Sequence, residues 1–439
     1  MSSATERGIW RPLLAGDAAA EIREAVGDIA RSLDREAAGS QGPSLQGQAG
    51  VALLFAHLHT AEPEGGYGEQ AMERLDDAIG EVAARELAAQ LYPGFPGIAW
   101  ATEHLRGRVF DLDADDEDPN LEIDAAVRER LGVSPWMADY DLIVGLVGLG
   151  VYALERLPRP AAAECLSLLL DRLEETCERR PEGVTWLTRP ELLWNVIRAG
   201  SPEGLYNLGM AHGVPGVIAL LAEMCGAGVA AERARPLLAS AVSWLLAQKR
   251  AGAEAEEGGF FFPGTVGPGI RTTNSRLAWC YGDVGIAAAL FLAGRLGGEP
   301  AWEREAVEVA LLAARRPDER TGVNDAGLCH GAAGLAHIFN RLYQASGDEE
   351  LADAARAWYR RTLDYRRPGE GLGGFLTWEP RTPEAEFEWL LNPGFLSGSA
   401  GIGLALLAAV EPAEPLWDRL LLVSVPPRVS VPASREAES

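Results

Sequence analysis

The sequence is short of positive charge and of long apolar runs. Lysine and arginine number 39 against 64 acidic residues, which gives a net charge of −25, and no basic cluster compensates. This charge balance argues against nucleic-acid binding through phosphate contacts. No apolar stretch reaches the length that spans a bilayer. The first residues, MSSATERGIWRPLLAGD, also lack the basic start and apolar centre of a secretory signal.

Cysteine is scarce as well, with five residues in 439. An odd number in a long chain excludes a disulfide framework. We therefore expect a cytoplasmic protein in a reducing compartment, where cysteines serve metal binding or catalysis. Cys165, Cys177 and Cys225 lie within apolar helical patterns and are expected in the core, which leaves Cys280 and Cys329 for chemistry.

What the sequence does contain is a repeat. Apolar residues make up 47% and charged residues 23%, as in a globular protein. Length alone suggests two or three domains, but Gly-x-x-Gly followed by an apolar run occurs seven times. The glycine pairs are 47/50, 94/97, 145/148, 213/216, 282/285, 331/334 and 398/401. A repeat on this scale predicts an array of similar helical units rather than separate domains.

Two kinds of helix alternate along this repeat. The runs after the glycines, such as 286–293 and 402–409, are apolar on nearly all sides, which predicts buried inner helices. Stretches between them, such as 22–33, are apolar on one face only, which predicts outer helices. An open superhelix would need polar caps, yet both terminal units keep the buried pattern. We therefore predict an all-α protein, a closed α/α toroid of seven inner and seven outer helices.

The spacing of the repeat also indicates where the chain departs from the regular helical units. We expect one toroid domain over residues 1–424, with insertions at about 160–205 and 251–275, and a disordered tail over 425–439. The loops 251–270 and 367–394 can shape a peptide-binding surface near the mouth of the ring. Residues 111–122 match the acidic positions of a calcium loop but lack its glycine, which favours a solvated acidic loop.

Residues just before the glycines should meet at one end of the ring. Among them are two thiols and an imidazole, Cys280, Cys329 and His330. These are three of the four ligands of a tetrahedral zinc site, and an open fourth position is typical of catalytic zinc. A cysteine before an apolar helix is also often a small buried apolar residue. Spacing alone leaves both interpretations open.

Three more polar residues belong to the same set of turns. His212 can be a helix-start histidine or a general acid near the metal. Asp141 can cap a helix or orient His212. Arg276 can form a surface ion pair or stabilise a developing oxyanion. The remaining histidines fall inside helical runs without a partner motif: His57, His59, His104 and His337.

The motifs Trp-Cys-Tyr-Gly at 279–282, Cys-His-Gly at 329–331 and Ala-His-Gly at 211–213 resemble those of the lanthionine synthetase C-like proteins. The resemblance covers about residues 40–410 and is strongest to the stand-alone bacterial cyclases of lantibiotic biosynthesis. It implies the toroid fold with a small inserted region. It also implies one zinc ion per chain, held by Cys280, Cys329 and His330, and active-site positions at His212, Asp141, Arg276 and Tyr281.

The activity implied by the resemblance is a zinc-dependent addition of cysteine thiolates to dehydroalanine or dehydrobutyrine. The substrate would be a dehydrated precursor peptide, and the product would contain lanthionine or methyllanthionine rings. A separate dehydratase and an export transporter are implied partners, which would hold the protein peripherally at the membrane.

Three alternatives stay open at this point. One is a zinc-containing relative that binds thiols or glutathione without cyclase activity. A protein prenyltransferase would use a similar toroid, but it needs a basic diphosphate pocket that the motifs lack. An inactive helical scaffold would bind no metal.

Overall fold

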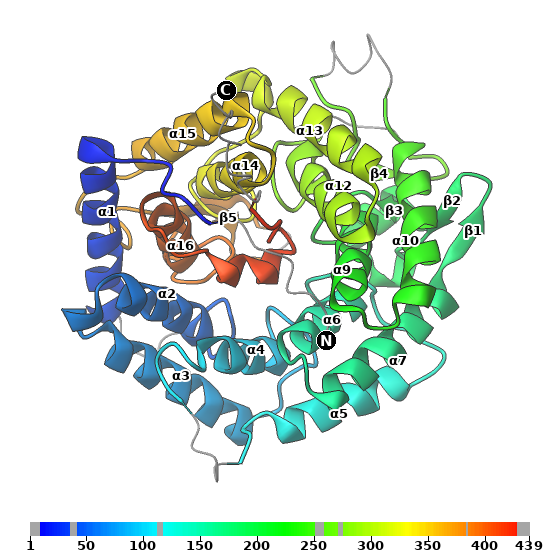
Figure 1. Ribbon diagram of the computed structural model, residues 1–439, viewed down its shortest axis with the longest axis horizontal. Coiled ribbons are helices and arrows are strands. Elements are labelled where there is room, and N and C mark those ends of the chain that lie inside the picture. Colours follow the sequence, from blue (N-terminus) through cyan, green and yellow to red (C-terminus); the bar gives the residue numbers. More distant parts are fainter. Residues whose placement is uncertain are drawn as a thin grey trace, which may run out of the picture.

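The computed structural model describes residues 9–35, 42–111, 117–250, 259–270, 275–382 and 385–427. Within these residues the helices form two concentric rings (Figure 1). Each inner helix begins directly after the first glycine of one Gly-x-x-Gly pair. The inner helices are α2 (Gln48–Ala61), α4 (Phe95–Leu105), α6 (Leu146–Glu155), α9 (Val214–Ala227), α12 (Asp283–Gly297), α14 (Ala332–Ser346) and α16 (Ser399–Val410).

Each inner helix is covered by one outer helix. The outer helices are α1 (Gly16–Arg35), α3 (Tyr67–Ala84), α5 (Leu121–Gly132), α7 (Pro160–Thr176), α10 (Ala231–Leu246), α13 (Pro300–Ala314) and α15 (Glu349–Asp364). Every inner helix contacts the next, and α16 contacts α2. The N-terminal helix α1 covers α16, so the two ends of the array close the ring. The predicted all-α toroid is confirmed.

Burial follows the apolar pattern of each helix. All residues of α16 are buried, as expected for a helix without a polar face. In α1 only one face is buried, including Ile22, Val26, Ile29 and Leu33. The sequence therefore sets the layer that each helix occupies.

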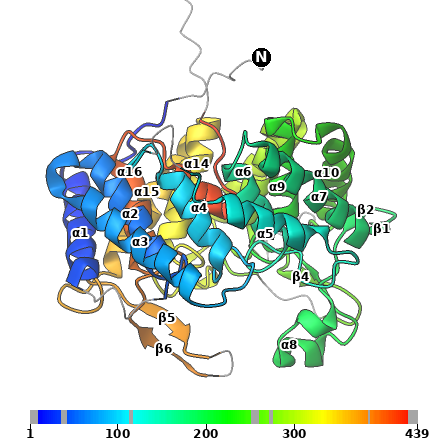
Figure 2. The ribbon, with the colours of Figure 1, turned by 90° about the horizontal axis from the view of Figure 1, so that it is seen from below.

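Within the described residues the strands form three small antiparallel pairs, all in segments of chain that run from an outer helix to the next inner helix. They are β1 (Glu178–Arg180) with β2 (Gly183–Thr185), β3 (Tyr206–Asn207) with β4 (Thr265–Val266), and β5 (Thr377–Pro380) with β6 (Phe387–Leu390). In β5–β6, Thr377 lies opposite Leu390. The β5–β6 hairpin and the short helix α8 (Asn195–Gly200) project from the same face of the ring (Figure 2).

The insertion expected over 160–205 is shorter in the structure. Residues 160–176 form α7, which packs on α6 as the other outer helices pack on their partners. The departure from the repeat starts at β1 and includes η3 (Pro190–Leu192) and α8. Of the second expected insertion, residues 251–258 and 271–274 lie outside the described residues.

A short 3-10 helix, η5 (Leu416–Leu421), occupies the centre of the ring (Figure 1). The Trp279 indole donates to the carbonyl of Leu421 at 2.9 Å, and the Tyr92 hydroxyl donates to that of Leu420 at 2.7 Å. We call residues 411–427, which contain η5, the central segment. It connects inner helices that are far apart around the ring.

Charged side chains hold this central segment. Asp418 is fully buried and pairs with His337 at 2.8 Å and with Arg341 at 2.6 Å. Two of the expected tail residues also pack here, since Val425 is buried and the Pro426 carbonyl accepts from Arg295. Residues 428–439 of that tail lie outside the described residues.

Two further expectations concern the acidic loop and membrane spans. Positions 112–116 of the acidic loop lie outside the described residues. Asp118, which follows them, accepts from Arg156 and Arg159 at 2.8 Å each. Among the described residues, we find no helix with the length and apolar character needed to cross a bilayer.

Candidate metal centre

Backbone groups, rather than side chains, cap the start of three inner helices, α6, α14 and α16. A helix begins with N–H groups that have no partner within the helix. In α14, the N–H groups of Ala332, Ala333 and Gly334 donate to the carbonyls of Asp325, Ala326 and Gly327 at 2.9, 3.1 and 3.3 Å. The same three bonds recur at α6 and α16. The chain before each of these three helices thus folds back over the helix start.

This fold-back explains the glycine pairs. A Cβ at Gly334 would lie 1.9 Å from the Leu328 carbonyl oxygen, and one at Gly401 would lie 1.8 Å from that of Phe395. No real Cβ tolerates such a distance, so the crossing carbonyl requires glycine. Gly282 is a special case because its φ is also positive, at 112°.

Four of the turns share a second device, six residues before the first glycine. There an aspartate or asparagine side chain accepts from the backbone N–H two residues on, which is an Asx turn. The donor–acceptor distances range from 2.9 to 3.3 Å, and the residues are Asp139, Asn207, Asp325 and Asn392.

Backbone hydrogen bonds then join the turns to one another. The chain of donors and acceptors is Leu142 to Ala211 (3.0 Å), Ala211 to Cys280 (3.4 Å), Cys280 to Cys329 (3.2 Å) and Cys329 to Leu396 (2.8 Å). We call this chain the turn belt. It explains why residues from different repeats meet at one end of the ring.

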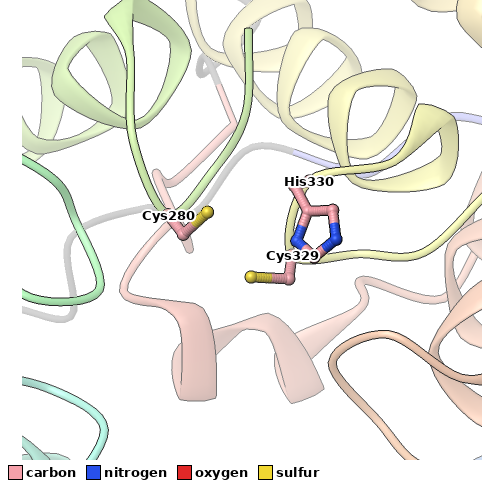
Figure 3. A group of neighbouring side chains, drawn as sticks. All are labelled: Cys280, Cys329 and His330. Atoms are coloured by element: carbon pink, nitrogen blue, oxygen red, sulfur yellow. The ribbon is translucent and has the colours of Figure 1, made fainter. Parts of the chain in front are cut away.

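The belt brings the three predicted ligands together. The sulfurs of Cys280 and Cys329 and a ring nitrogen of His330 all lie within 4.8 Å of one another. Figure 3 shows the two thiols and the imidazole turned toward the same space between the turns that start α12 and α14. Cys280 is buried, whereas Cys329 and His330 are half-buried, so the group opens to one side.

The two thiols do not titrate alike. Hydrogen bonding to Cys329 and to His330 outweighs burial and lowers the pKa of Cys280 well below its usual value. The same pairing with Cys280, together with burial, raises the pKa of Cys329 well above its usual value. Without a nearby cation, therefore, only one of the two thiolates is favoured. Two thiols and one imidazole fit zinc, and they leave its fourth position for another ligand.

A histidine–carboxylate pair lies on the neighbouring turns. Nδ1 of His212 is 2.6 Å from Oδ2 of Asp141. The Asp141 side chain is 2% exposed and that of His212 is 41% exposed. Burial lowers the pKa of His212, but the hydrogen bond and charge of Asp141 outweigh it, and the pKa ends above its usual value. The pair can hold a proton on an imidazole that solvent or a ligand can reach.

Tyr281 extends this pair toward the metal ligands. Its ring centroid is 6.0 Å from that of His212. The buried Asn207 donates to the Tyr281 hydroxyl at 3.0 Å, which fixes that oxygen. Burial raises the pKa of Tyr281 to about 12, so the hydroxyl stays protonated at neutral pH.

Arg276 is the outlying member of the predicted set. Its side chain is exposed, and it occupies the place where four other turns carry the Asx residue. Its charge contributes, after the hydrogen bonds and burial, to the lowered pKa of Cys280. The guanidinium is therefore close enough to the site for its charge to act on the thiols.

Two polar residues of this site were missed from the sequence. Asn207 fixes Tyr281, and Oδ2 of Asp325 accepts from the Trp378 N–H at 3.0 Å, which attaches the β5–β6 hairpin to the ligand-bearing turn. The recurrence of Asp or Asn six residues before a repeat glycine is the signal that could have revealed both.

Fold and site together define a class: a closed α/α toroid with a two-cysteine, one-histidine centre at the end where its inner helices begin. A model of the lanthionine synthetase C-like protein family matches residues 42–422. The chain belongs to this family.

Individual relatives are distant. The nisin biosynthesis protein NisC of Lactococcus lactis subsp. lactis is 25% identical over 322 residues, covering 67% of this chain and 73% of NisC. Glutathione S-transferase LANCL1 of Danio rerio is 24% identical over 378 residues, covering 84% and 82%. The solved structure of nisin cyclase is 21% identical, with a TM-score of 0.72 over 92% of this chain and 97% of that chain. At this identity the structure supports the shared fold.

Proposed function

We propose that this protein is a zinc-dependent peptide cyclase. It adds cysteine thiolates to dehydroalanine or dehydrobutyrine in a dehydrated precursor peptide and so forms lanthionine and methyllanthionine rings. The observation that carries the proposal is the gathering of Cys280, Cys329 and His330 beside the His212–Asp141 pair. Membership of the lanthionine synthetase C-like family supports it, as does similarity to NisC.

The residues divide the chemistry between them. Cys280, Cys329 and His330 would hold the zinc ion, which when bound lowers the pKa of a substrate thiol. Addition of that thiolate to the β-carbon leaves an enolate, which needs a proton at the α-carbon. His212 donates that proton, and Asp141 keeps the imidazole oriented and protonated. Arg276 stabilises the negative charge of the enolate.

The face around the site suits a peptide. Phe387 and Trp389 on strand β6 and Leu391 directly after it are 51%, 39% and 60% exposed. The Trp378 and Trp389 rings lie 5.1 Å apart. Because the Trp378 N–H is bonded to Asp325, this apolar surface adjoins the ligand-bearing turn. The 367–394 loop is therefore our candidate for the peptide path, in a cytoplasmic enzyme that works with a separate dehydratase and exporter.

The test uses a synthetic peptide with one cysteine and one dehydroalanine. Alkylatable thiol should disappear without a change in peptide mass, in proportion to bound zinc. Cys280→Ala should lose both zinc and cyclisation. His212→Asn should keep stoichiometric zinc and lose about 10²–10⁴-fold in rate, the usual contribution of a general acid.

A second candidate function is thiol or glutathione binding without cyclisation, favoured by the similarity to LANCL1. The same zinc site would serve it. In that case the peptide thiol would be retained by the protein but would stay alkylatable after release. Full zinc in Cys280→Ala would contradict the ligand assignment under either function.

A further inference from the structure

The β5–β6 hairpin projects from one face of the ring (Figure 2), and three side-chain hydrogen bonds attach its base. Two of them stay within the segment that leads to α16, from Thr377 to Ser397 at 2.9 Å and from Asn392 to Glu379 at 2.8 Å. The third runs from the Trp378 N–H to Oδ2 of Asp325 at 3.0 Å. Asp325 belongs to the turn before α14, which carries two of the candidate metal ligands, so this bond links the hairpin to the ligand-bearing turn.

Asp325 uses both of its carboxylate oxygens. Oδ1 accepts from the Gly327 N–H at 3.1 Å, while Oδ2 accepts from Trp378. Oδ1 also lies against Gly331, where an added Cβ would be 2.5 Å from it, and Gly331 directly follows His330. The residue is only 2% exposed. One planar, buried group is therefore fixed between the hairpin and the backbone beside a candidate metal ligand.

The other three Asx turns show that the second oxygen is particular to Asp325. Asn207 and Asn392 build the same turn with their single side-chain oxygen and use the amide nitrogen as a donor. Asp139 accepts both of its backbone N–H bonds on Oδ1. Asparagine offers one acceptor oxygen where aspartate offers two. At Asp325, by contrast, the two bonds to different segments require both oxygens.

The other end of this link belongs to the aromatic surface of the hairpin. The Trp378 ring lies 5.1 Å from that of Trp389 and 6.1 Å from that of Phe387. A two-stranded hairpin is only marginally stable by itself. A peptide that packs on these rings would hold the hairpin in one arrangement, and the Trp378 N–H would then hold Asp325 and its turn. Ligands that are ordered in advance bind with a smaller loss of conformational entropy.

We propose that Asp325 is a positioning residue that couples peptide binding at the hairpin to metal binding by the ligand-bearing turn. This role rests on the proposed function, because it takes the β5–β6 hairpin as the peptide path. Asp325 acts through the Trp378 N–H on one side and through its own turn on the other. By linkage the coupling is reciprocal, so the zinc-bound protein should bind peptide more tightly by the same factor by which peptide raises the affinity for zinc.

The test is a double titration of the full chain. Zinc affinity is measured by chelator competition with and without a saturating synthetic peptide, which contains dehydroalanine and serine but no cysteine, histidine or acidic residue. Because this peptide lacks the side chains that bind zinc, a gain in affinity must come through the protein. The wild type should bind zinc at least about fivefold more tightly with the peptide than without it. Calorimetry measures binding of the peptide itself.

Asp325→Asn is the variant that breaks the link. It can accept from the Gly327 N–H or from the Trp378 N–H but not from both, so zinc affinity should no longer depend on the peptide. A purely structural role would instead lower zinc affinity equally with and without peptide. The matched control is Asp139→Asn, which makes the same change in the turn before α6 and keeps both bonds on one oxygen. There the dependence on peptide should remain.

Trp389→Ala tests the same link without a change in the turn. It should weaken peptide binding and leave zinc affinity in the absence of peptide unchanged. The proposal is overturned by an unchanged dependence on peptide in Asp325→Asn, by unchanged peptide binding in Trp389→Ala, or by a wild type that binds no peptide or shows no coupling. A wild type that shows the coupling but leaves a cysteine-containing dehydrated peptide uncyclised would instead refute the proposed function and keep the role of Asp325.

Discussion

At the end of the ring where the inner helices begin, backbone groups join one repeat to the next, whereas at the other end charged side chains do so. The first end has the turn belt, in which Ala211, Cys280 and Cys329 are linked through main-chain atoms. At the second end, Arg156 is buried among Asp118, Asp124 and Glu103. This difference determines which end of the ring can carry functional side chains.

A backbone joint leaves the side chains free. In the turn belt most positions outside the glycines can vary, and units four to six use that freedom to present His212, Cys280, Cys329 and His330. At the other end the side chains form buried ion pairs. They cannot be replaced freely, because removal of one partner leaves a buried charge. Substitutions at the two ends should therefore fail in different ways.

The largest effect is expected from Gly334→Ala. The new Cβ would lie 1.9 Å from the Leu328 carbonyl oxygen, which is backbone and cannot turn away. We expect a loss of at least about 3 kcal/mol in unfolding free energy, together with loss of bound zinc. Urea unfolding and metal analysis measure both.

The matched control is Gly80→Ala. Gly80 lies inside α3, and an added Cβ there meets nothing within 4 Å. This change should stabilise the protein by about 0.5–1 kcal/mol, because alanine favours helix. A Gly334→Ala protein as stable as the wild type would show that the fold-back over the helix start is not required.

The next effect concerns the central segment. Asp418→Asn removes the fully buried one of the two carboxylates that pair with the buried Arg341 guanidinium, leaving only Glu414, and should cost about 3 kcal/mol. Burial raises the pKa of Asp418, but the Arg341 charge and the His337 hydrogen bond outweigh it and lower the pKa to about 2. The wild type therefore has this stabilisation above the usual carboxyl pKa of 3.8 and loses it as the pH falls toward 2.

Urea unfolding between pH 7 and pH 2 checks this prediction. The stability difference between wild type and Asp418→Asn should shrink as the pH falls through that range. Glu350→Gln removes an exposed partner of Arg315 and should change stability by less than about 1 kcal/mol. Equal losses in the two variants would mean that burial does not matter to these pairs.

The smallest effect on stability is expected at Trp279, which lies in the turn belt and contacts the central segment. Trp279→Phe removes the indole bond to Leu421 and leaves that carbonyl without its donor, at a cost of about 1–2 kcal/mol. Because Trp279 adjoins Cys280, zinc affinity should fall as well. Trp389→Phe, on the exposed hairpin, is the control and should leave both quantities unchanged. A chelator competition assay reports the affinity.

The ring of helices could be predicted from the sequence because each repeat unit is specified by residues that are close together in the chain. A glycine pair before an apolar run specifies the turn, the buried helix and the register of residues before the turn. Cys280, Cys329 and His330 could be grouped from that register alone, and the structure brings them together.

Contacts between segments that share no repeat pattern could not be predicted from the sequence. Tyr92 and Leu420 are 328 positions apart, and nothing in either segment indicates the other. Asn207 was missed because its role depends on Tyr281, in a different turn.

The central segment also bears on the order of synthesis. Residues 411–427 leave the ribosome after every helix of the ring. Two contacts within the ring depend on them, because the Trp279 indole donates to the Leu421 carbonyl and the Arg341 guanidinium pairs with Asp418. A nascent chain that already has all seven inner helices therefore still lacks the acceptor for Trp279 and both carboxylates that pair with Arg341. Translation that stops short of this segment should yield an incomplete, protease-sensitive ring, so we expect the candidate metal centre to take its final form only after the whole chain has been made.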